Sequence, residues 1–300
     1  MSPSECHVEV VANKQIAPEY FSMRLAGPAR LARFRPGQFL MLGWTDGRDP
    51  LLSRAMSIRS AKSPHPPFSK GGNGGIWGAK CEVEILYKVC GRGTALLAAM
   101  RPGRSLRVVG PLGNGFEISR NVTSAVLIAG GIGVPPIAAL TEVLATRCAA
   151  HGTKIAVFLG GRSKADLLCV SDLRRAGATV RVATEDGSAG HKGLVTELLE
   201  QYLDARRSTL DGPLYACGPH PMLAAIAPIA ERHNMPYQAS MEANMACGFG
   251  ACMGCVVPIR GNARERTYRL VCKDGPIFDG REILWDEQGA GVGKMEGSAV

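Results

Sequence analysis

The sequence predicts a multidomain fold of the α/β plus β class, with an antiparallel β-barrel, a Rossmann-like parallel α/β domain and a small cysteine-rich domain. Three observations predict it. Short alternating strand patterns fill the first third, strand and helix patterns then alternate, and four cysteines gather after residue 245. We place the domains at 1–118, 119–238 and 239–288, followed by a glycine-rich tail at 289–300 that we expect to be disordered.

The charge of the chain limits its partners. It carries 35 Lys and Arg against 26 Asp and Glu, a formal net charge of +9. The basic residues are scattered, whereas a nucleic-acid-binding protein gathers them into a patch or arm. We therefore expect no nucleic acid, and we assign the charge to anionic cofactors or an acidic partner surface.

The cellular compartment follows from hydropathy and cysteine use. No apolar run is long enough to span a bilayer, and the first residues lack the apolar core of a secretory signal. Ten cysteines in such a chain are typical of a reducing compartment. We expect a cytoplasmic protein without membrane association.

The first domain contains six short strand patterns separated by Pro-Gly and Gly-rich turns, which are typical of a compact antiparallel barrel. The six patterns span 7–16, 20–27, 38–44, 55–60, 81–89 and 105–110, with a helical segment at 94–100. Residues 61–78 are rich in Pro, Gly, Ser and Lys, and we interpret them as a flexible surface loop without chemistry.

Two motifs in this barrel carry chemistry. Arg54 and Ser57 place a cation and a hydroxyl on one strand, and an arginine fork suits a diphosphate. Residues 91–94 lead into a helix whose N-terminus would attract an anion. Each motif alone is equally an ordinary solvated arginine or a simple turn. Together they favour a cofactor that carries a diphosphate.

Strand and helix patterns alternate from residue 122 to residue 233, which is typical of parallel βαβ units. The first turn carries Gly130, Gly131 and Gly133, which would let a dinucleotide pyrophosphate approach the backbone, and Pro135 begins the helix. The turn lacks the G-x-G-x-x-G order, so a turn without a ligand stays an alternative.

Other residues follow strands at the same predicted edge of the sheet. Cys217, Gly218 and Pro219 end a later strand, where Cys217 is either part of a nicotinamide site or a buried core cysteine. Arg162 and the acidic pair at 185–186 are candidates for ribose contact. They do not decide between NADH and NADPH.

The cysteine-rich segment has the spacing C-x4-C-x2-C followed by a distant fourth cysteine. Its members are Cys247, Cys252, Cys255 and Cys272. This spacing is typical of a plant-type [2Fe–2S] cluster, whereas a zinc site would pair one CxxC with a second CxxC or with histidines. Glycines at 248, 250 and 254 would let the backbone wrap the cluster and point N–H groups at the sulfurs.

These motifs, in this order, resemble the ferredoxin–NADP reductase superfamily and, within it, the electron-transfer subunits of class 1B dihydroorotate dehydrogenase. The most specific are RAMSI at 54–58, GRGT at 91–94, AGGIGVPP at 129–136, YACGPHPM at 215–222, SMEANMACGFGACMGCVVP at 240–258 and RLVCKDGPIFDG at 269–280. The resemblance covers nearly the whole chain except 61–78 and the tail.

The resemblance implies a barrel that binds FAD, an α/β domain that binds NAD and a [2Fe–2S] domain ligated by the four cysteines. The FAD contacts that it implies are Arg54, Ala55, Met56, Ser57, Leu86, Tyr87, Lys88, Gly93 and Thr94. The family usually has proline where this chain has Ala55, which loosens the backbone locally but leaves Arg54 and Ser57 in place.

The function that the resemblance implies is electron transfer in pyrimidine biosynthesis. The cluster would take electrons from the FMN of a catalytic dihydroorotate dehydrogenase subunit, in a heterotetramer with two copies of each chain. A flavin exchanges both hydrides and single electrons, so FAD would stand between the cluster and NAD+. We expect no catalytic acid or base in this chain, and dihydroorotate oxidation only in the partner.

Two other functions stay open. One is the FAD and [2Fe–2S] subunit of an NAD(P)H:ferredoxin or sulfide oxidoreductase complex. Some members of that group replace the first cluster cysteine by aspartate, so Cys247 favours the dihydroorotate branch. The other is a non-catalytic iron–sulfur redox sensor or adaptor, which would need neither the flavin barrel nor the nucleotide site.

Overall fold

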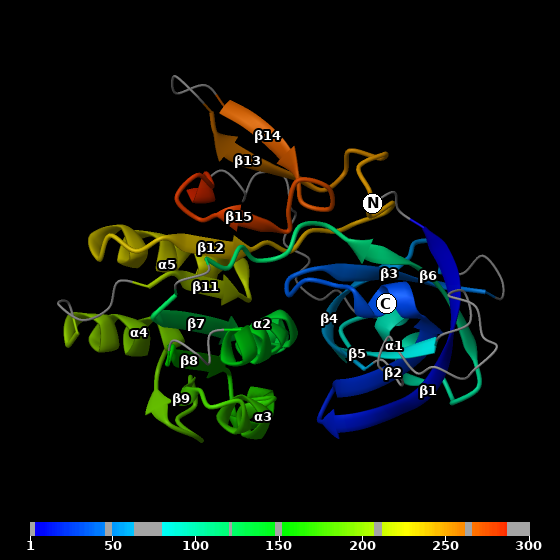
Figure 1. Ribbon diagram of the computed structural model, residues 1–300, viewed down its shortest axis with the longest axis horizontal. Helices are drawn as coiled ribbons and strands as arrows, with labels where there is room; N and C mark the ends of the chain where they lie inside the picture. Colours follow the sequence, from blue (N-terminus) through cyan, green and yellow to red (C-terminus); the bar gives the residue numbers. More distant parts are fainter. Residues whose placement is uncertain are drawn as a thin grey trace.

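A computed structural model describes residues 4–45, 50–62, 80–119, 122–147, 152–206, 212–261 and 266–286. Most of the loop expected at 61–78 and the whole tail lie outside the described residues. Figure 1 shows a barrel built from the N-terminal part, a sheet flanked by helices beside it, and a hairpin from the C-terminal part above both.

The N-terminal part is a closed six-stranded barrel, as predicted. Its strands are paired antiparallel in the order β1-β2-β5-β4-β3-β6. Alternate residues point inward, as in β6, where every second side chain is buried. The bounds are β1 Glu5–Ala17, β2 Tyr20–Pro28, β3 Phe39–Trp44, β4 Arg54–Lys62, β5 Lys80–Lys88 and β6 Ser105–Leu112, with helix α1 at Arg92–Ala98.

The central part is a parallel sheet with helices on both faces, which also confirms the prediction. Strand β7 is buried along its whole length because both faces are covered. Helices α2 and α3 cover the face toward the barrel, and α4 and α5 cover the other. The bounds are β7 Ser124–Gly130, α2 Val134–Arg147, β8 Lys154–Gly161, α3 Val170–Arg175, β9 Thr179–Thr184, β10 His191–Lys192, α4 Val195–Asp204, β11 Leu214–Cys217, α5 His220–Arg232 and β12 Tyr237–Ser240.

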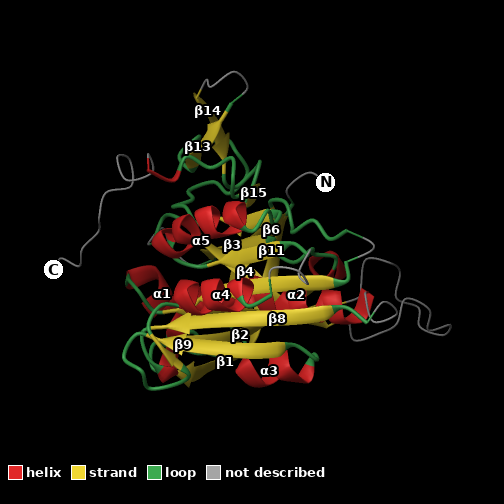
Figure 2. Cartoon of the chain, turned by 90° about the vertical axis from the view of Figure 1, so that its left-hand side faces the viewer, coloured by secondary structure: helices red, strands yellow, loops and turns green. Residues whose placement is uncertain are grey.

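The C-terminal part contributes a strand to this sheet as well as a separate hairpin. The sheet order is β10-β9-β8-β7-β11-β12-β15, and β15 (Ile277–Asp279) pairs antiparallel with β12. The expected boundary at 238/239 therefore falls inside β12. Strands β13 (Val256–Arg260) and β14 (Arg266–Leu270) form the hairpin, which stands apart in the side view of Figure 2.

The segment between barrel and sheet ties the three parts together. Asn114 donates its backbone N–H to the Gly275 carbonyl, 2.6 Å away, and Phe116 donates to the Pro36 carbonyl at 2.8 Å. The Glu117 N–H donates to the Gln238 side chain at 2.9 Å. Backbone hydrogen bonds from one short segment thus hold the barrel, the sheet and the C-terminal part in fixed relation.

Candidate functional site

The two barrel motifs predicted to hold a diphosphate meet in the structure. Arg54 begins β4, and Gly93 lies in the first turn of α1. A Cβ atom on Gly93 would lie 2.5 Å from Cζ of Arg54, so only glycine lets the guanidinium rest against this turn. Arg54 also donates to the Leu52 carbonyl at 2.6 Å. The Arg54 guanidinium therefore lies against the backbone of the first turn of α1. A cation next to a helix N-terminus fits an anionic diphosphate.

The other residues expected around FAD divide by the direction of their side chains. Met56 and Tyr87 point into the barrel core, where the Tyr87 hydroxyl donates to Asn13 at 2.9 Å. Thr94 accepts hydrogen bonds from the N–H groups of Cys90 and Gly91, so its hydroxyl shapes the turn. Ala55 is exposed, Ser57 is half-buried, and Leu86 and Lys88 face outward from β5.

A cleft of about 470 Å³ lies between the barrel and the carboxyl ends of the parallel strands. This edge is where sheets of this type bind nucleotides. Tyr20 and Lys88 line the cleft from the barrel side. From the sheet side it is lined by residues that end or directly follow β7, β8, β9 and β11, among them Gly130, Gly131, Gly160, Gly161, Arg162, Glu185, Gly218 and Pro219.

The glycines of the first nucleotide turn have different roles. Gly131 has φ of +52° and no atom within 4 Å of an added Cβ, and it lines the cleft. A Cβ on Gly133 would instead lie 2.8 Å from Cα of Gly218, so this glycine lets the helix pack against the neighbouring strand end. Pro135 is buried at the start of α2 and, like Gly133, does not line the cleft.

The structure places Cys217 in the core. Its side chain is 3% exposed and packs in the hydrophobic cluster around β7 and α2. Burial raises the pKa of its thiol well above the usual range, and the nearby Glu242 raises it further. Glu242, which belongs to none of the predicted motifs, also lines the cleft, and its side chain is exposed there.

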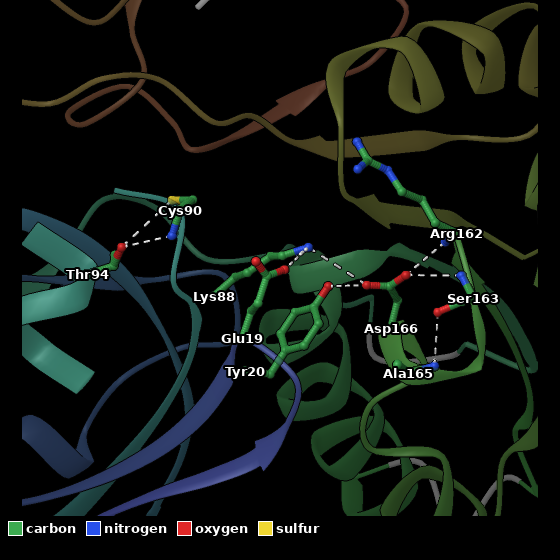
Figure 3. A network of polar contacts seen from close by, with 9 residues as sticks. All are labelled: Glu19, Tyr20, Lys88, Cys90, Thr94, Arg162, Ser163, Ala165 and Asp166. Carbon is green, nitrogen blue, oxygen red and sulfur yellow. Dashed lines mark hydrogen bonds and ion pairs between the residues drawn. The ribbon is translucent and has the colours of Figure 1, made fainter. Parts of the chain in front are cut away.

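A polar network that the sequence did not predict connects the barrel to the nucleotide domain beside the cleft (Figure 3). Tyr20 donates its hydroxyl to Oδ1 of Asp166 at 2.6 Å. The other oxygen of Asp166 accepts from the backbone N–H groups of Arg162 and Ser163 at 3.0 and 3.1 Å. Burial acts to raise the pKa of Asp166, but these hydrogen bonds and the Lys88 ammonium hold it below its usual value.

The four cluster cysteines fall into two pairs. Cys252 donates its backbone N–H to Sγ of Cys247 at 3.5 Å, and Cys272 donates to Sγ of Cys255 at 3.4 Å. In the first pair Cys252 is exposed and Cys247 is half-buried, whereas Cys255 and Cys272 are each 2% exposed. Among the residues that the structure describes, no three His, Cys, Asp or Glu side chains converge on a single metal position.

Backbone N–H groups point at two of the sulfurs, but the hydrogen-bond donors are those of Cys252 and Cys272 and not those of the loop glycines. Burial acts to raise the pKa of Cys247, but N–H groups from Cys252, Phe249 and Ala251 lower it to about 6. Burial and the neighbouring Cys255 raise the pKa of the Cys272 thiol to about 12. A loop that already directs donors at a thiolate fits an iron–sulfur cluster, whose sulfurs accept such hydrogen bonds.

The cluster loop packs on the barrel. Gly248 has φ of +82°, and a Cβ on it would lie 2.9 Å from Sδ of Met41 in β3. Gly250 also has positive φ, at +92°. The third left-handed residue of the loop is Met253, at +57°, and Gly254 takes an ordinary conformation. Glycine at 248 is therefore required by both conformation and contact.

Comparison with known families agrees with this layout. Residues 242–284 match the iron–sulfur cluster binding domain of dihydroorotate dehydrogenase B, and residues 127–227 match the oxidoreductase NAD-binding domain. The chain is 38% identical over 278 residues to the dihydroorotate dehydrogenase B (NAD(+)) electron transfer subunit of Bacillus caldolyticus, covering 92% of this chain and 96% of the relative. The protein of the same name from Desulforamulus reducens is 33% identical over 281 residues, covering 93% and 97%.

Solved structures show the same fold. A chain of the NADH-dependent reduced ferredoxin–NADP oxidoreductase superposes with a TM-score of 0.75 and 28% identity, over 96% of this chain and 92% of that one. The ferredoxin NADP+ reductase of Neisseria gonorrhoeae, solved with FAD and NADP, superposes with a TM-score of 0.58 at 17% identity, over 81% and 95%. The second likeness concerns the fold alone.

The fold and the sites define a reductase of the ferredoxin–NADP reductase type that carries an additional iron–sulfur domain. The chain belongs to the family of dihydroorotate dehydrogenase B electron transfer subunits. It is thus an oxidoreductase subunit whose family and fold imply FAD, a [2Fe–2S] cluster and NAD as cofactors. In the described part of the chain, no helix has the length and hydropathy needed to cross a membrane.

Proposed function

We propose that this chain passes electrons, derived from the oxidation of dihydroorotate to orotate in a partner subunit, through a [2Fe–2S] cluster and FAD to NAD+. One observation carries the proposal. Gly248 of the cluster loop contacts Met41 of β3, and Met41 is paired with Ala55 of β4, within the motif expected to hold FAD. Cross-strand neighbours lie about 5 Å apart, so one strand separates the two sites.

The barrel residues bind and orient the flavin. FAD, when bound, exchanges hydrides with nicotinamide and single electrons with an iron–sulfur centre. The Arg54 guanidinium would pair with its diphosphate, and Gly93 makes room for that guanidinium. Ser57, half-buried on the same strand, offers a hydroxyl to a polar edge of the cofactor.

The cleft residues would bind the nicotinamide dinucleotide. Gly131 leaves its backbone open for the pyrophosphate. Glu185 lines the cleft, whereas the carboxylate of Asp186 accepts hydrogen bonds from Ser188 at 2.6 and 2.9 Å. Glu185 is therefore the acid free to accept from ribose hydroxyls, and its charge disfavours a 2′-phosphate, which supports NAD over NADP.

The cluster ligands would be the four cysteines in their observed pairs. A two-iron cluster takes two thiolates on each iron, and the two observed pairs, Cys247 with Cys252 and Cys255 with Cys272, would supply them. The more open pair, in which Cys252 is exposed, lies on the side where a partner would approach.

The partner would dock around this open pair. Large apolar side chains are exposed there, among them Phe249 at 45% and Met253 at 61% on the loop, and Val256 at 48% and Tyr268 at 61% on the hairpin. An exposed apolar patch of this kind marks an interaction site. By resemblance, the partner is the FMN-containing catalytic subunit, in a complex with two copies of each chain. The five described cysteines outside the proposed cluster are free thiols, which favours the cytoplasm.

The proposal is tested by assaying this chain first alone and then together with the catalytic subunit. The chain, purified alone and anaerobically, should contain FAD and the cluster, and NADH should bleach the flavin within seconds. It should not oxidise dihydroorotate with a dye acceptor, and should couple that oxidation to NAD+ only after the catalytic subunit is added. Robust dihydroorotate oxidation by the isolated chain would refute the division of labour.

A second candidate is the FAD subunit of a ferredoxin-linked oxidoreductase. The 28% identity over 96% of the chain to a NADH-dependent reduced ferredoxin–NADP oxidoreductase favours it. The 38% identity to a dihydroorotate dehydrogenase B subunit weighs more. Identification of the subunit that co-purifies with the native protein distinguishes the two.

A further inference from the structure

Tyr20 belongs to the barrel by sequence but packs inside the nucleotide domain. It is the first residue of β2, is 3% exposed, and lies in the hydrophobic cluster formed around β7 and α2. Its ring is thus anchored in one domain while its backbone belongs to the other. The hydroxyl at the end of the ring reaches the cleft.

That hydroxyl meets the carboxylate that shapes the turn after β8. Asp166 accepts from Tyr20 with one oxygen and from the N–H groups of Arg162 and Ser163 with the other. The turn continues into the cleft wall, since Gly161 and Arg162 both line it. Figure 3 shows the Arg162 side chain pointing away from Asp166, so the carboxylate holds only its backbone.

The same turn supports the next strand end. The carbonyl of Gly161 accepts the N–H of Glu185 at 3.1 Å, and the carbonyl of Arg162 accepts the N–H of Asp186 at 3.1 Å. A displacement of the turn would therefore move Glu185 and Arg162 together. Both are charged residues that line the cleft.

The charge of Asp166 is balanced from the barrel side. Nζ of Lys88 lies 3.9 Å from Asp166 and 3.5 Å from Glu19, and it stands 4.9 Å from the centre of the Tyr20 ring. The barrel thus supplies both the donor and the counter-charge. The contact joins two domains through one carboxylate.

We propose that Tyr20 is a positioning residue for the nicotinamide dinucleotide: its hydroxyl holds the 161–166 turn in place and so sets the cleft wall relative to the flavin barrel. This inference rests on the proposed function, because it takes NAD as the ligand of the cleft. In this proposal Tyr20 acts through Asp166, to which its hydroxyl donates.

The test uses Tyr20→Phe in the full chain with its cofactors. A hydrogen bond to a charged group contributes enough that the dissociation constant for NADH should rise about tenfold. The bleaching rate at saturating NADH should stay within about twofold, because bound dinucleotide restores the turn. Hydrogen exchange of residues 161–166 should be faster than in the unaltered protein, and saturating NAD+ should reverse this.

Tyr237→Phe is the matched control. Its hydroxyl donates to the Leu223 carbonyl at 3.0 Å inside the same domain, and neither Tyr237 nor Leu223 lines the cleft. The change should lower stability and leave NADH affinity unaltered. Asp166→Asn should also weaken NADH binding, and the double variant with Tyr20→Phe should lose less than the sum of the two losses, because both act through one contact.

The inference is overturned if Tyr20→Phe binds NADH like the unaltered protein, or if its loss of affinity and the loss caused by Asp166→Asn simply add. Failure of the proposed function looks different, because NADH would then not bleach the flavin of the unaltered protein at all.

Discussion

Gly248 of the cluster loop lies in van der Waals contact with Met41 of the barrel, at a point where a Cβ atom would be 2.9 Å from the methionine sulfur. Because Met41 pairs with Ala55, this contact joins the iron–sulfur loop to the flavin motif through a single strand. The barrel lines the nucleotide cleft with Tyr20 and Lys88, which are paired at the ends of β2 and β5.

Gly248→Ala should weaken cluster binding. The residue has φ of +82° and no room for a side chain, so the loop would have to move away from the barrel. We expect less iron and labile sulfide per chain and lower absorbance of the cluster in the visible range. The control is Gly254→Ala, where an added Cβ meets only the Cys252 sulfur at 3.7 Å. Equal cluster content in the two variants would contradict the prediction.

Gly93→Ala should weaken FAD retention. The added methyl group would occupy the place of the Arg54 guanidinium and push it off the first turn of α1. We expect loss of most of the flavin on gel filtration, measured as the ratio of flavin to protein absorbance. Gly91→Ala is the matched control, because an added Cβ there has no atom within 4 Å and the backbone is extended. Full flavin content in Gly93→Ala would count against the site.

Glu142→Gln should destabilise the contact between barrel and nucleotide domain. Arg59 is 5% exposed and pairs with Glu142 at 2.8 Å and with Asp172 at 3.5 Å, so the change removes the nearer of the two carboxylates from a buried cation. Because Glu142 itself is half exposed, we expect a loss of about 2 kcal/mol in the free energy of unfolding, measured in urea.

The control for this ion pair is the same substitution at an exposed one. Glu82 pairs with Arg24 at 3.0 Å, and both side chains are at least 40% exposed. Glu82→Gln should cost less than about 1 kcal/mol. Similar losses in the two variants would show that the buried pair does not join the domains.

Asp166 should make the stability of the protein depend on pH in acid. Its folded pKa is held below the ordinary value of 3.8, so the ionised form stabilises the fold. That contribution is fully present above the ordinary value and is lost as the pH falls through the lower folded value. The difference in unfolding free energy between the unaltered protein and Asp166→Asn should therefore shrink below about pH 4. A difference that stays constant or grows would contradict this.

The sequence predicted the elements that have a clear period. The six barrel strands alternate and the nucleotide strands are apolar runs, so both domains were found. Between β8 and β9 the chain does not form one continuous helix, which the alternating pattern alone does not reveal. It forms a 3-10 turn at Lys164–Asp166 and then helix α3, because Cys169 between them has φ of +60°. Strand β15 was missed because three residues are too short to show a period.

The site was predictable where its residues are neighbours in sequence. The cysteine spacing and the glycine turns are local patterns, whereas Tyr20 and Asp166 are 146 positions apart and neither belongs to a motif. For Cys217, the sequence predicted the position in the chain but did not decide the environment of the side chain. Its place at a strand end was predicted, but its burial in the core depends on the packing of α2 and the barrel.

The proposed electron route is tested most directly by an anaerobic titration of the purified chain with NADH, followed by visible absorbance after iron, labile sulfide and FAD have been quantified. We expect FAD together with a two-iron, two-sulfide cluster in every chain, and flavin absorbance that bleaches as NADH is added. A colourless protein, or one that holds both chromophores and does not respond to NADH, would contradict it.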